Sequence, residues 1–100
     1  MNKAIMDDRT LYEKKIEAEL REMQARLDLL RAQAASAAVD VRIRIERELD
    51  RLRDRRSELR RGLDELRSAG EAGWTRIREG MDAARRELAD GLESLAAKLR

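Results

Sequence analysis

A single apolar stripe runs through most of this 100-residue chain and constrains its fold more than any other feature. From residue 10 to residue 66 an apolar side chain recurs every three or four positions, and most residues between are charged. This spacing places the apolar side chains on one face of an α-helix. The stripe consists of Tyr12, Ile16, Leu20, Met23, Leu27, Leu30, Ala34, Ala38, Val41, Ile45, Leu49, Leu52, Leu59, Leu63 and Leu66. It predicts how the chain assembles and leaves its biochemical role open.

The composition favours helices throughout. Charged residues make up 44% of the chain, proline is absent, and the aromatic residues are one Trp and one Tyr. Alanine, arginine, glutamate and leucine dominate, which is typical of coiled coils and long helices. A disordered chain of this charge would lack the regular apolar spacing. We therefore predict an all-α protein with a thin aliphatic core.

The chain lacks several residue types on which enzymes commonly rely for catalysis. The chain contains no Cys and no His, which excludes disulfides, thiolate zinc sites, thiol nucleophiles and imidazole bases. Carboxylate pairs such as Asp64 and Glu65 remain, but a thin helical assembly offers no obvious pocket in which to desolvate them. We predict a non-enzymatic protein without a cofactor or a metal.

Charges of both signs alternate along the chain, with 23 basic and 21 acidic residues and a net charge of +2. Pairs three or four residues apart, such as Glu17 and Arg21, predict ion pairs within a helix. The arginine-rich segment 42–61 carries an acid in nearly every turn, unlike a DNA-binding basic region, so we do not expect nucleic-acid binding. Residues 1–10 do not resemble a signal peptide, and no uncharged stretch approaches 18 residues. The expectation is a cytoplasmic protein.

The stripe predicts one long coiled-coil helix over residues 10–67, preceded by a flexible segment over residues 1–9. Thr10 and Glu13 form a capping-box pattern at its start, and Asp7 and Asp8 are alternative caps. The alanine-rich stretch 32–38 contains neither Gly nor Pro, which favours a continuous helix there. A turn near residues 36–40, giving three shorter helices, is the alternative.

A second helix is predicted after a Gly-containing turn over residues 68–73. Gly70 suits a left-handed residue at the end of the first helix, and Ser68 and Glu71 form a second capping-box pattern. Residues 74–100 then form an amphipathic helix with an eleven-residue repeat, because residues 77–87 align with residues 88–98. Gly80 and Gly91 occupy the same position of this repeat.

Three segments carry a resemblance to a known group of proteins. They are YEKKIEA at residues 12–18, ELDRLR at residues 48–53, and Gly73-Trp74 leading into Gly80 and the repeat. Together they resemble small bacterial coiled-coil proteins associated with stress responses. The eleven-residue repeats also resemble those of exchangeable apolipoproteins. The first resemblance implies a cytoplasmic helical protein and brings no catalytic residue.

We therefore predict a helical hairpin in which the shorter C-terminal helix covers only the later half of the long helix. The earlier half of the stripe would stay exposed in a monomer and pair with another chain. A coiled-coil oligomer is expected, preferably a homodimer, and a different helical protein is a further possible partner. The predicted self-association residues are Ile16, Leu20, Met23, Leu27, Leu30, Ala34 and Ala38.

The remaining apolar residues are predicted either to pack the hairpin or to face a membrane. They are Leu49, Leu52, Leu59, Leu63, Leu66, Trp74, Ile77, Met81, Leu88, Leu92, Leu95 and Leu99. The predicted function is that of a structural or scaffold protein with a stress-related role, acting through self-association or partner binding. The alternative is binding to a membrane surface through the C-terminal amphipathic helix.

Overall fold

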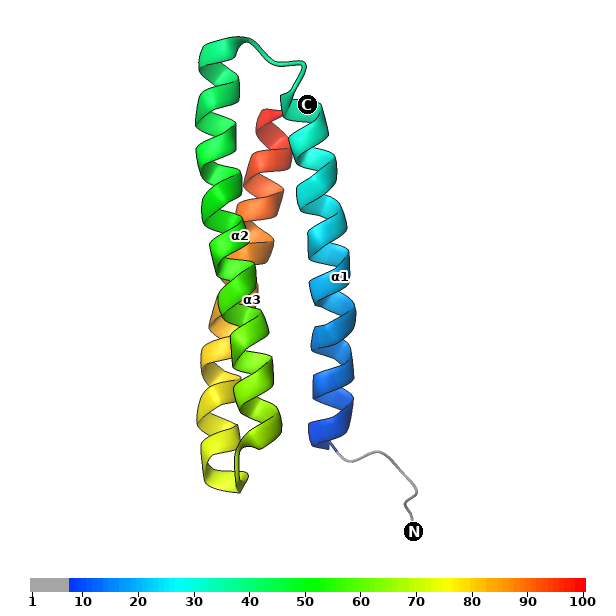
Figure 1. Cartoon of the computed structure of the whole chain (residues 1–100), viewed down its shortest axis with the longest axis vertical. Coiled ribbons are helices and arrows are strands. Elements are labelled where there is room, and N and C mark those ends of the chain that lie inside the picture. Colours follow the sequence, from blue (N-terminus) through cyan, green and yellow to red (C-terminus); the bar gives the residue numbers. More distant parts are fainter. Residues whose placement is uncertain (1–7) are drawn as a thin grey trace.

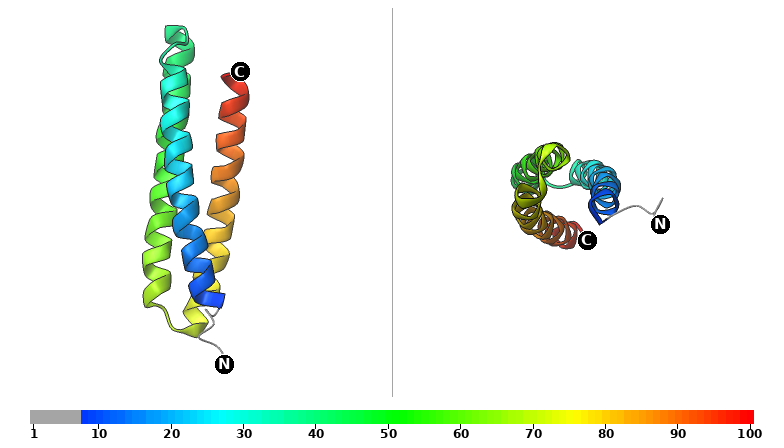
Figure 2. Two further views of the ribbon diagram at one scale, coloured as in Figure 1. Left: turned by 90° about the vertical axis from the view of Figure 1, so that its right-hand side faces the viewer. Right: turned by 90° about the horizontal axis from the view of Figure 1, so that it is seen from below.

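The computed structural model describes residues 8–100, and every regular element among them is an α-helix. The helices are α1 (Asp8–Ala34), α2 (Val39–Ser68) and α3 (Glu71–Lys98). Each helix runs antiparallel to the one before it, so the start of α1 and the end of α3 lie at opposite ends of the molecule (Figure 1). Figure 2 shows the three helices side by side along their length. The prediction of an all-α fold is confirmed.

The prediction of one continuous helix over residues 10–67 is wrong, because residues 35–38 leave the helix. The amides of Ser36 and Ala37 donate to the carbonyls three residues earlier, at 3.3 and 3.0 Å, which tightens and ends the last turn of α1. Ala38 then has an extended backbone (φ −58°, ψ 151°) and precedes α2. The arrangement of three shorter helices is the one observed.

Tertiary packing explains why the best helix-forming residue fails to keep this segment helical. Breaking the helix loses a few backbone hydrogen bonds of about 1 kcal/mol each. The break lets α1 fold back along α2, so that five large apolar side chains of α1 become buried. Burial of each contributes about 1.5–3 kcal/mol, which outweighs alanine's helix propensity. They are Ile16, Leu20, Met23, Leu27 and Leu30.

The start of α1 differs from its predicted position. The helix begins at Asp8, so Thr10 and Glu13 lie within its first turns and do not cap it. Asp8 and Arg9 are helical, and the rest of the predicted flexible segment, with the alternative cap Asp7, lies outside the described residues. An acidic residue in the first turn interacts favourably with the positive end of the helix.

Only residues 69 and 70 separate α2 from α3, fewer than the predicted turn. Gly70 has φ −74° and ψ 175°, an extended conformation at the start of α3, so the predicted left-handed role is wrong. The predicted second capping box is also wrong, because the Ser68 hydroxyl donates to the Asp64 carbonyl at 3.4 Å. The end of α2 is held instead by Arg9 of α1, whose Nη2 donates to the carbonyls of Leu66 (3.3 Å) and Ala69 (2.8 Å).

Two glycines allow close packing between α2 and α3. A Cβ atom built on Gly91 of α3 would lie 2.4 Å from Cδ2 of Leu52, and one built on Gly62 of α2 would lie 2.9 Å from Cγ of Met81. Gly80, at the same repeat position as Gly91, would meet nothing within 4 Å. The sequence repeat therefore places its two glycines in different environments.

Candidate functional site

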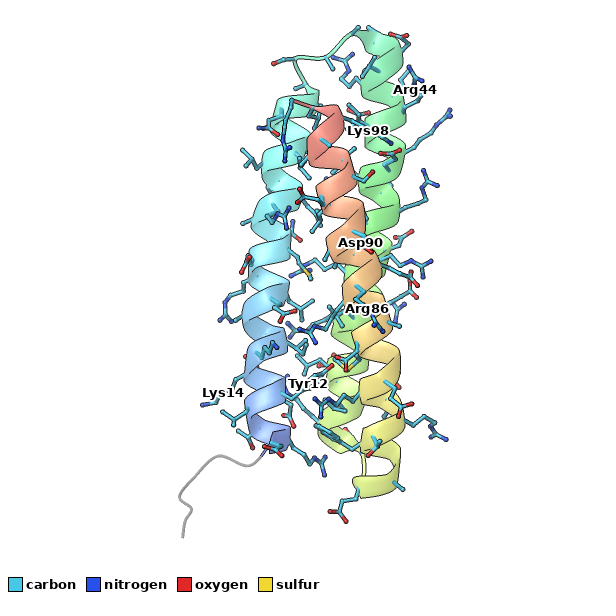
Figure 3. The ribbon with its side chains drawn as sticks, turned by 180° about the vertical axis from the view of Figure 1, so that it is seen from behind. Tyr12, Lys14, Arg44, Arg86, Asp90 and Lys98 are labelled. Carbon is cyan, nitrogen blue, oxygen red and sulfur yellow. The ribbon has the colours of Figure 1, made fainter. Side chains whose placement is uncertain are left out.

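A connected group of interacting side chains lies where α1 begins, α2 ends and α3 begins. We call it the aromatic–arginine cluster. The residues from α1 lie between positions 9 and 19, and those from α3 lie on four successive turns between positions 74 and 85. Its members are Arg9, Tyr12, Glu19, Trp74, Arg78, Asp82 and Arg85. Figure 3 shows Tyr12 pointing from α1 toward α3.

Aromatic and cationic groups alternate in this cluster. The rings of Tyr12 and Trp74 meet edge to face, with centroids 5.7 Å apart and an interplanar angle of 69°. The Arg78 guanidinium lies 4.8 Å from the Tyr12 ring and 5.5 Å from the Trp74 ring, and that of Arg9 lies 5.6 Å from Trp74. In such cation–π contacts the face of an aromatic ring attracts the positive charge of the guanidinium. The buried Trp74 indole nitrogen has no acceptor within the described part of the chain.

Hydrogen bonds join α1 to α3 beside these rings. The Tyr12 hydroxyl donates to Oδ1 of Asp82 at 2.7 Å, and Arg85 Nη1 donates to the same oxygen at 2.8 Å. Arg85 also donates two hydrogen bonds to the Glu19 carboxylate, from Nε at 2.8 Å and from Nη2 at 2.7 Å. A two-bonded arginine–carboxylate pair fixes orientation as well as distance. The network therefore sets the register of α1 against α3.

The pKa values of this network move away from neutrality. Burial and the bond to Asp82 raise the pKa of Tyr12 to about 12. Burial opposes ionisation of Asp82, yet the hydrogen bonds from Tyr12 and Arg85 leave its pKa below the usual value. The bonds to Glu19 raise the pKa of Arg85 despite its partial burial. General acid–base catalysis needs pKa values near the working pH. These shifts instead favour a neutral Tyr12, an ionised Asp82 and a charged Arg85.

Most of the predicted self-association residues are buried inside the single chain. Relative exposure is at most 8% for Ile16, Leu20, Met23, Leu27, Leu30 and Ala34, while Ala38 is exposed in the connection. The prediction that this seam stays exposed in a monomer is wrong, because α1 separates from α2 and folds back along it. These side chains form one core with the apolar faces of α2 and α3.

The residues assigned to hairpin packing or a membrane face also lie in this core. Those buried are Leu49, Leu52, Leu59, Leu63, Leu66, Trp74, Met81, Leu88, Leu92 and Leu95. Ile77 and Leu99 are partly buried against them. In this structure the apolar face of α3 therefore contacts the other helices.

Ion pairs between helices line the edges of the core, and sequence reasoning missed them. Glu17 pairs with Arg67 of α2, whereas the sequence suggested Arg21. Lys98 of α3 pairs with Glu48 at 2.6 Å, and Arg26 of α1 pairs with Glu93 at 3.8 Å. Arg56, which interrupts the apolar stripe, donates from Nε to the Leu20 carbonyl at 2.9 Å. Opposite charges on neighbouring helix faces could have predicted these ion pairs. Using them requires knowledge of which helices pair and in which register.

Two open grooves follow the helix pairs. One of about 270 Å³ between α2 and α3 passes Gly91 and Ser94, and its edges carry Arg55 paired with Glu87 at 3.3 Å. Another of about 450 Å³ between α1 and α3 passes Met23 and the Arg85 network. Within residues 8–100, no group of three or more Asp or Glu side chains is placed to hold a metal ion. The grooves are edges of the helix packing and not enclosed pockets.

One further apolar stripe faces away from the bundle, along the outer face of α1. We call it the outer α1 face. Its residues are Leu11, Ala18, Ala25, Leu29 and Ala32, all exposed. Leu11 is 48% and Leu29 is 58% exposed, which places them among the four exposed large apolar residues of the described chain. Lys14 on the same side of α1 points away from the other helices in Figure 3.

Comparisons with protein-family models, with curated proteins and with solved structures found no match for this chain. None of the helices described by the structure is long and apolar enough to cross a membrane.

Proposed function

We propose that the protein is a non-enzymatic structural protein that acts through helix–helix contacts and forms a dimer with a second copy of itself. The observation that carries this proposal is the outer α1 face. Leu11, Ala18, Ala25 and Ala32 follow one another at intervals of seven residues, and all are exposed. A seam between two helices repeats two apolar positions in every seven residues. This face supplies one of them throughout and the second only at Leu29.

The side chains of this face suit close approach by another helix. Alanine is small enough for two helix backbones to lie near each other, and Leu11 and Leu29 supply larger apolar area toward either end. The core of the bundle is already filled by its own three helices. A second copy that docks on the outer α1 face therefore adds contacts without disturbing the fold.

The aromatic–arginine cluster supports a structural role in a second way. Its arginines, carboxylates and tyrosine are fixed to one another across α1 and α3. Such a network gives the bundle a defined register, which a repeated assembly needs. The expected setting is a stress response, in line with the resemblance described above.

Lipid binding through the apolar face of α3 is ranked below self-association. Leu88, Leu92 and Leu95 have 0% relative exposure. To meet lipid through them, α3 would have to leave α1 and α2 and give up this burial. The outer α1 face needs no such rearrangement.

Light scattering over a concentration series, with circular dichroism on the same samples, tests the proposal. We expect the parent chain to be a helical dimer at micromolar concentration. Ala25→Glu places a charge in the middle of the outer α1 face and should give a monomer of unchanged helicity. Ala83→Glu is the matched control, because Ala83 is an exposed alanine in α3. It should remain dimeric.

Two results would contradict the proposal in different ways. A parent chain that stays monomeric at every concentration removes self-association itself. A dimer that persists in Ala25→Glu assigns the contact to another face of the molecule.

A further inference from the structure

The end of the molecule that carries the α1–α2 connection differs in character from the rest. Residues 32–39 form an eight-residue stretch without charge in a chain that is 44% charged. Val39 is 62% and Ile43 is 45% exposed, and they lie on successive turns at the start of α2. Figure 1 shows this connection at the same end of the molecule as the C-terminus. Two large aliphatic side chains thus face solvent beside an apolar connection.

Four arginines lie on the helical segments that adjoin this connection. Arg31 lies in the last turn of α1, and Arg42, Arg44 and Arg47 lie in the first turns of α2. None of these four guanidiniums forms an ion pair within residues 8–100. The acids on the same segments are Asp40 and Glu46, and Arg31 lines a groove with Glu46 and with Asp50, which pairs with Arg53. The four arginines therefore outnumber the two acids of these segments. Figure 3 shows Arg44 on α2 near this end.

Three helix termini lie at this end, where α2 begins and α1 and α3 end. The carboxyl ends of α1 and α3 carry the negative ends of their dipoles, so the excess of positive charge here comes from the arginines. α2 begins without a side-chain cap, so its first amides and the positive end of its dipole are directed at the connection. Lys98 near the end of α3 adds a further cation, although it pairs with Glu48 at 2.6 Å. We call this region, comprising Arg31, Val39, Arg42, Ile43 and Arg44, the basic tip.

We propose that the basic tip binds an anionic lipid surface. Val39 and Ile43 insert at the boundary between headgroups and acyl chains, and Arg31, Arg42 and Arg44 contact lipid phosphates. This surface is distinct from the outer α1 face, and the proposal does not depend on the dimer. It also leaves the core closed, because the inserted side chains are already exposed.

The combination of aliphatic and cationic groups selects this occupant over two others. A nucleic-acid backbone uses the arginines but leaves Val39 and Ile43 in water. A second copy docked tip to tip would bring excess positive charge against positive charge. An anionic membrane satisfies both kinds of side chain at once.

Co-sedimentation of the full chain with vesicles tests the proposal. The vesicles contain phosphatidylcholine alone or a 70:30 mixture of phosphatidylcholine and phosphatidylserine. One variant, Val39→Ser with Ile43→Ser, removes the aliphatic groups. A second, Arg42→Gln with Arg44→Gln, removes two cations, and at roughly fivefold per cation it should weaken binding about 25-fold. Arg60→Gln with Arg61→Gln is the control, because these exposed arginines make the same charge change far from the tip.

The expected result is binding to the anionic vesicles that falls with salt and is weakened in both tip variants. The Arg60 and Arg61 control should bind like the parent chain, and circular dichroism should show equal helicity for all variants. Absence of binding to anionic vesicles would overturn the proposal. So would equal weakening in the control, which would indicate net charge alone. Binding as strong in both tip variants as in the parent chain would assign the lipid contact to another surface, and binding to a DNA duplex unaffected by the serine substitutions would assign the arginines to nucleic acid.

Discussion

Gly80 and Gly91 offer the sharpest test of how α2 and α3 pack, because they share a repeat position but not an environment. Replacing a helical glycine with alanine removes backbone freedom from the unfolded chain and stabilises a helix by about 0.5–1 kcal/mol. Nothing lies within 4 Å of a Cβ at Gly80. Gly80→Ala should therefore raise the free energy of unfolding by about that amount.

Gly91→Ala gains the same stabilisation from reduced backbone freedom, but its new methyl group overlaps a neighbouring side chain. Its Cβ would lie 2.4 Å from Cδ2 and 3.6 Å from Cγ of Leu52, so the leucine must change rotamer or the helices must separate. Overpacking of this kind costs about 1–3 kcal/mol. The two substitutions should therefore differ by about 1–3 kcal/mol in the free energy of unfolding, with Gly91→Ala the less stable.

Urea unfolding followed by circular dichroism measures this difference directly. Leu52→Ala is the internal control, because it removes the atoms that obstruct the new methyl group. In that background Gly91→Ala should stabilise the chain about as much as Gly80→Ala does. If Gly91→Ala already matches Gly80→Ala in the parent chain, α2 and α3 do not approach each other closely at this point.

Two further predictions concern the aromatic–arginine cluster. Because the pKa of Tyr12 is raised from 10.0 to about 12, its phenol stabilises the folded state below pH 10 and loses that contribution as the pH rises from 10 to 12. The free energy of unfolding should fall across this range, and the fall should be smaller in Tyr12→Phe when both are followed by urea unfolding. Arg85→Lys keeps the charge but loses the two-bonded grip on Glu19, so the free energy of unfolding should drop by about 1 kcal/mol. Arg86→Lys, at an exposed neighbouring position, should change the free energy of unfolding by no more than about 0.5 kcal/mol. An equal drop in both variants would mean that the two hydrogen bonds from Arg85 to Glu19 do not stabilise the fold.

The apolar periodicity was sufficient to predict the helical class and which side chains face a helix partner. Leu20 and Leu59 lie on the apolar stripe, Leu88 lies on the apolar face of the predicted C-terminal helix, and all three are buried. Periodicity reports which face of a helix is apolar and not what covers that face. It could therefore not distinguish a second copy from a later segment of the same chain.

The break at residues 35–38 was harder to predict because no local signal marks it. Alanine favours helix, and neither Gly nor Pro is present. The helix ends there because folding back buries the seam of α1, which is a property of the whole bundle. The same holds for the bonds of Arg9 to the carbonyls of α2 and of Arg85 to Glu19, since each joins residues more than fifty positions apart.

The odd number of helices within residues 8–100 has a consequence for any longer polypeptide that contains this bundle. A segment attached before Asp8 and another attached after Lys98 emerge from opposite ends (Figure 1). With 30 residues in α2 and a rise of 1.5 Å per residue, the two attachment points stand about 45 Å apart. A bundle of two or four helices would return both segments to the same end. This one instead holds the two segments apart by its own length, and a circular permutant that joins Lys98 back to Asp8 would require a linker long enough to span that length.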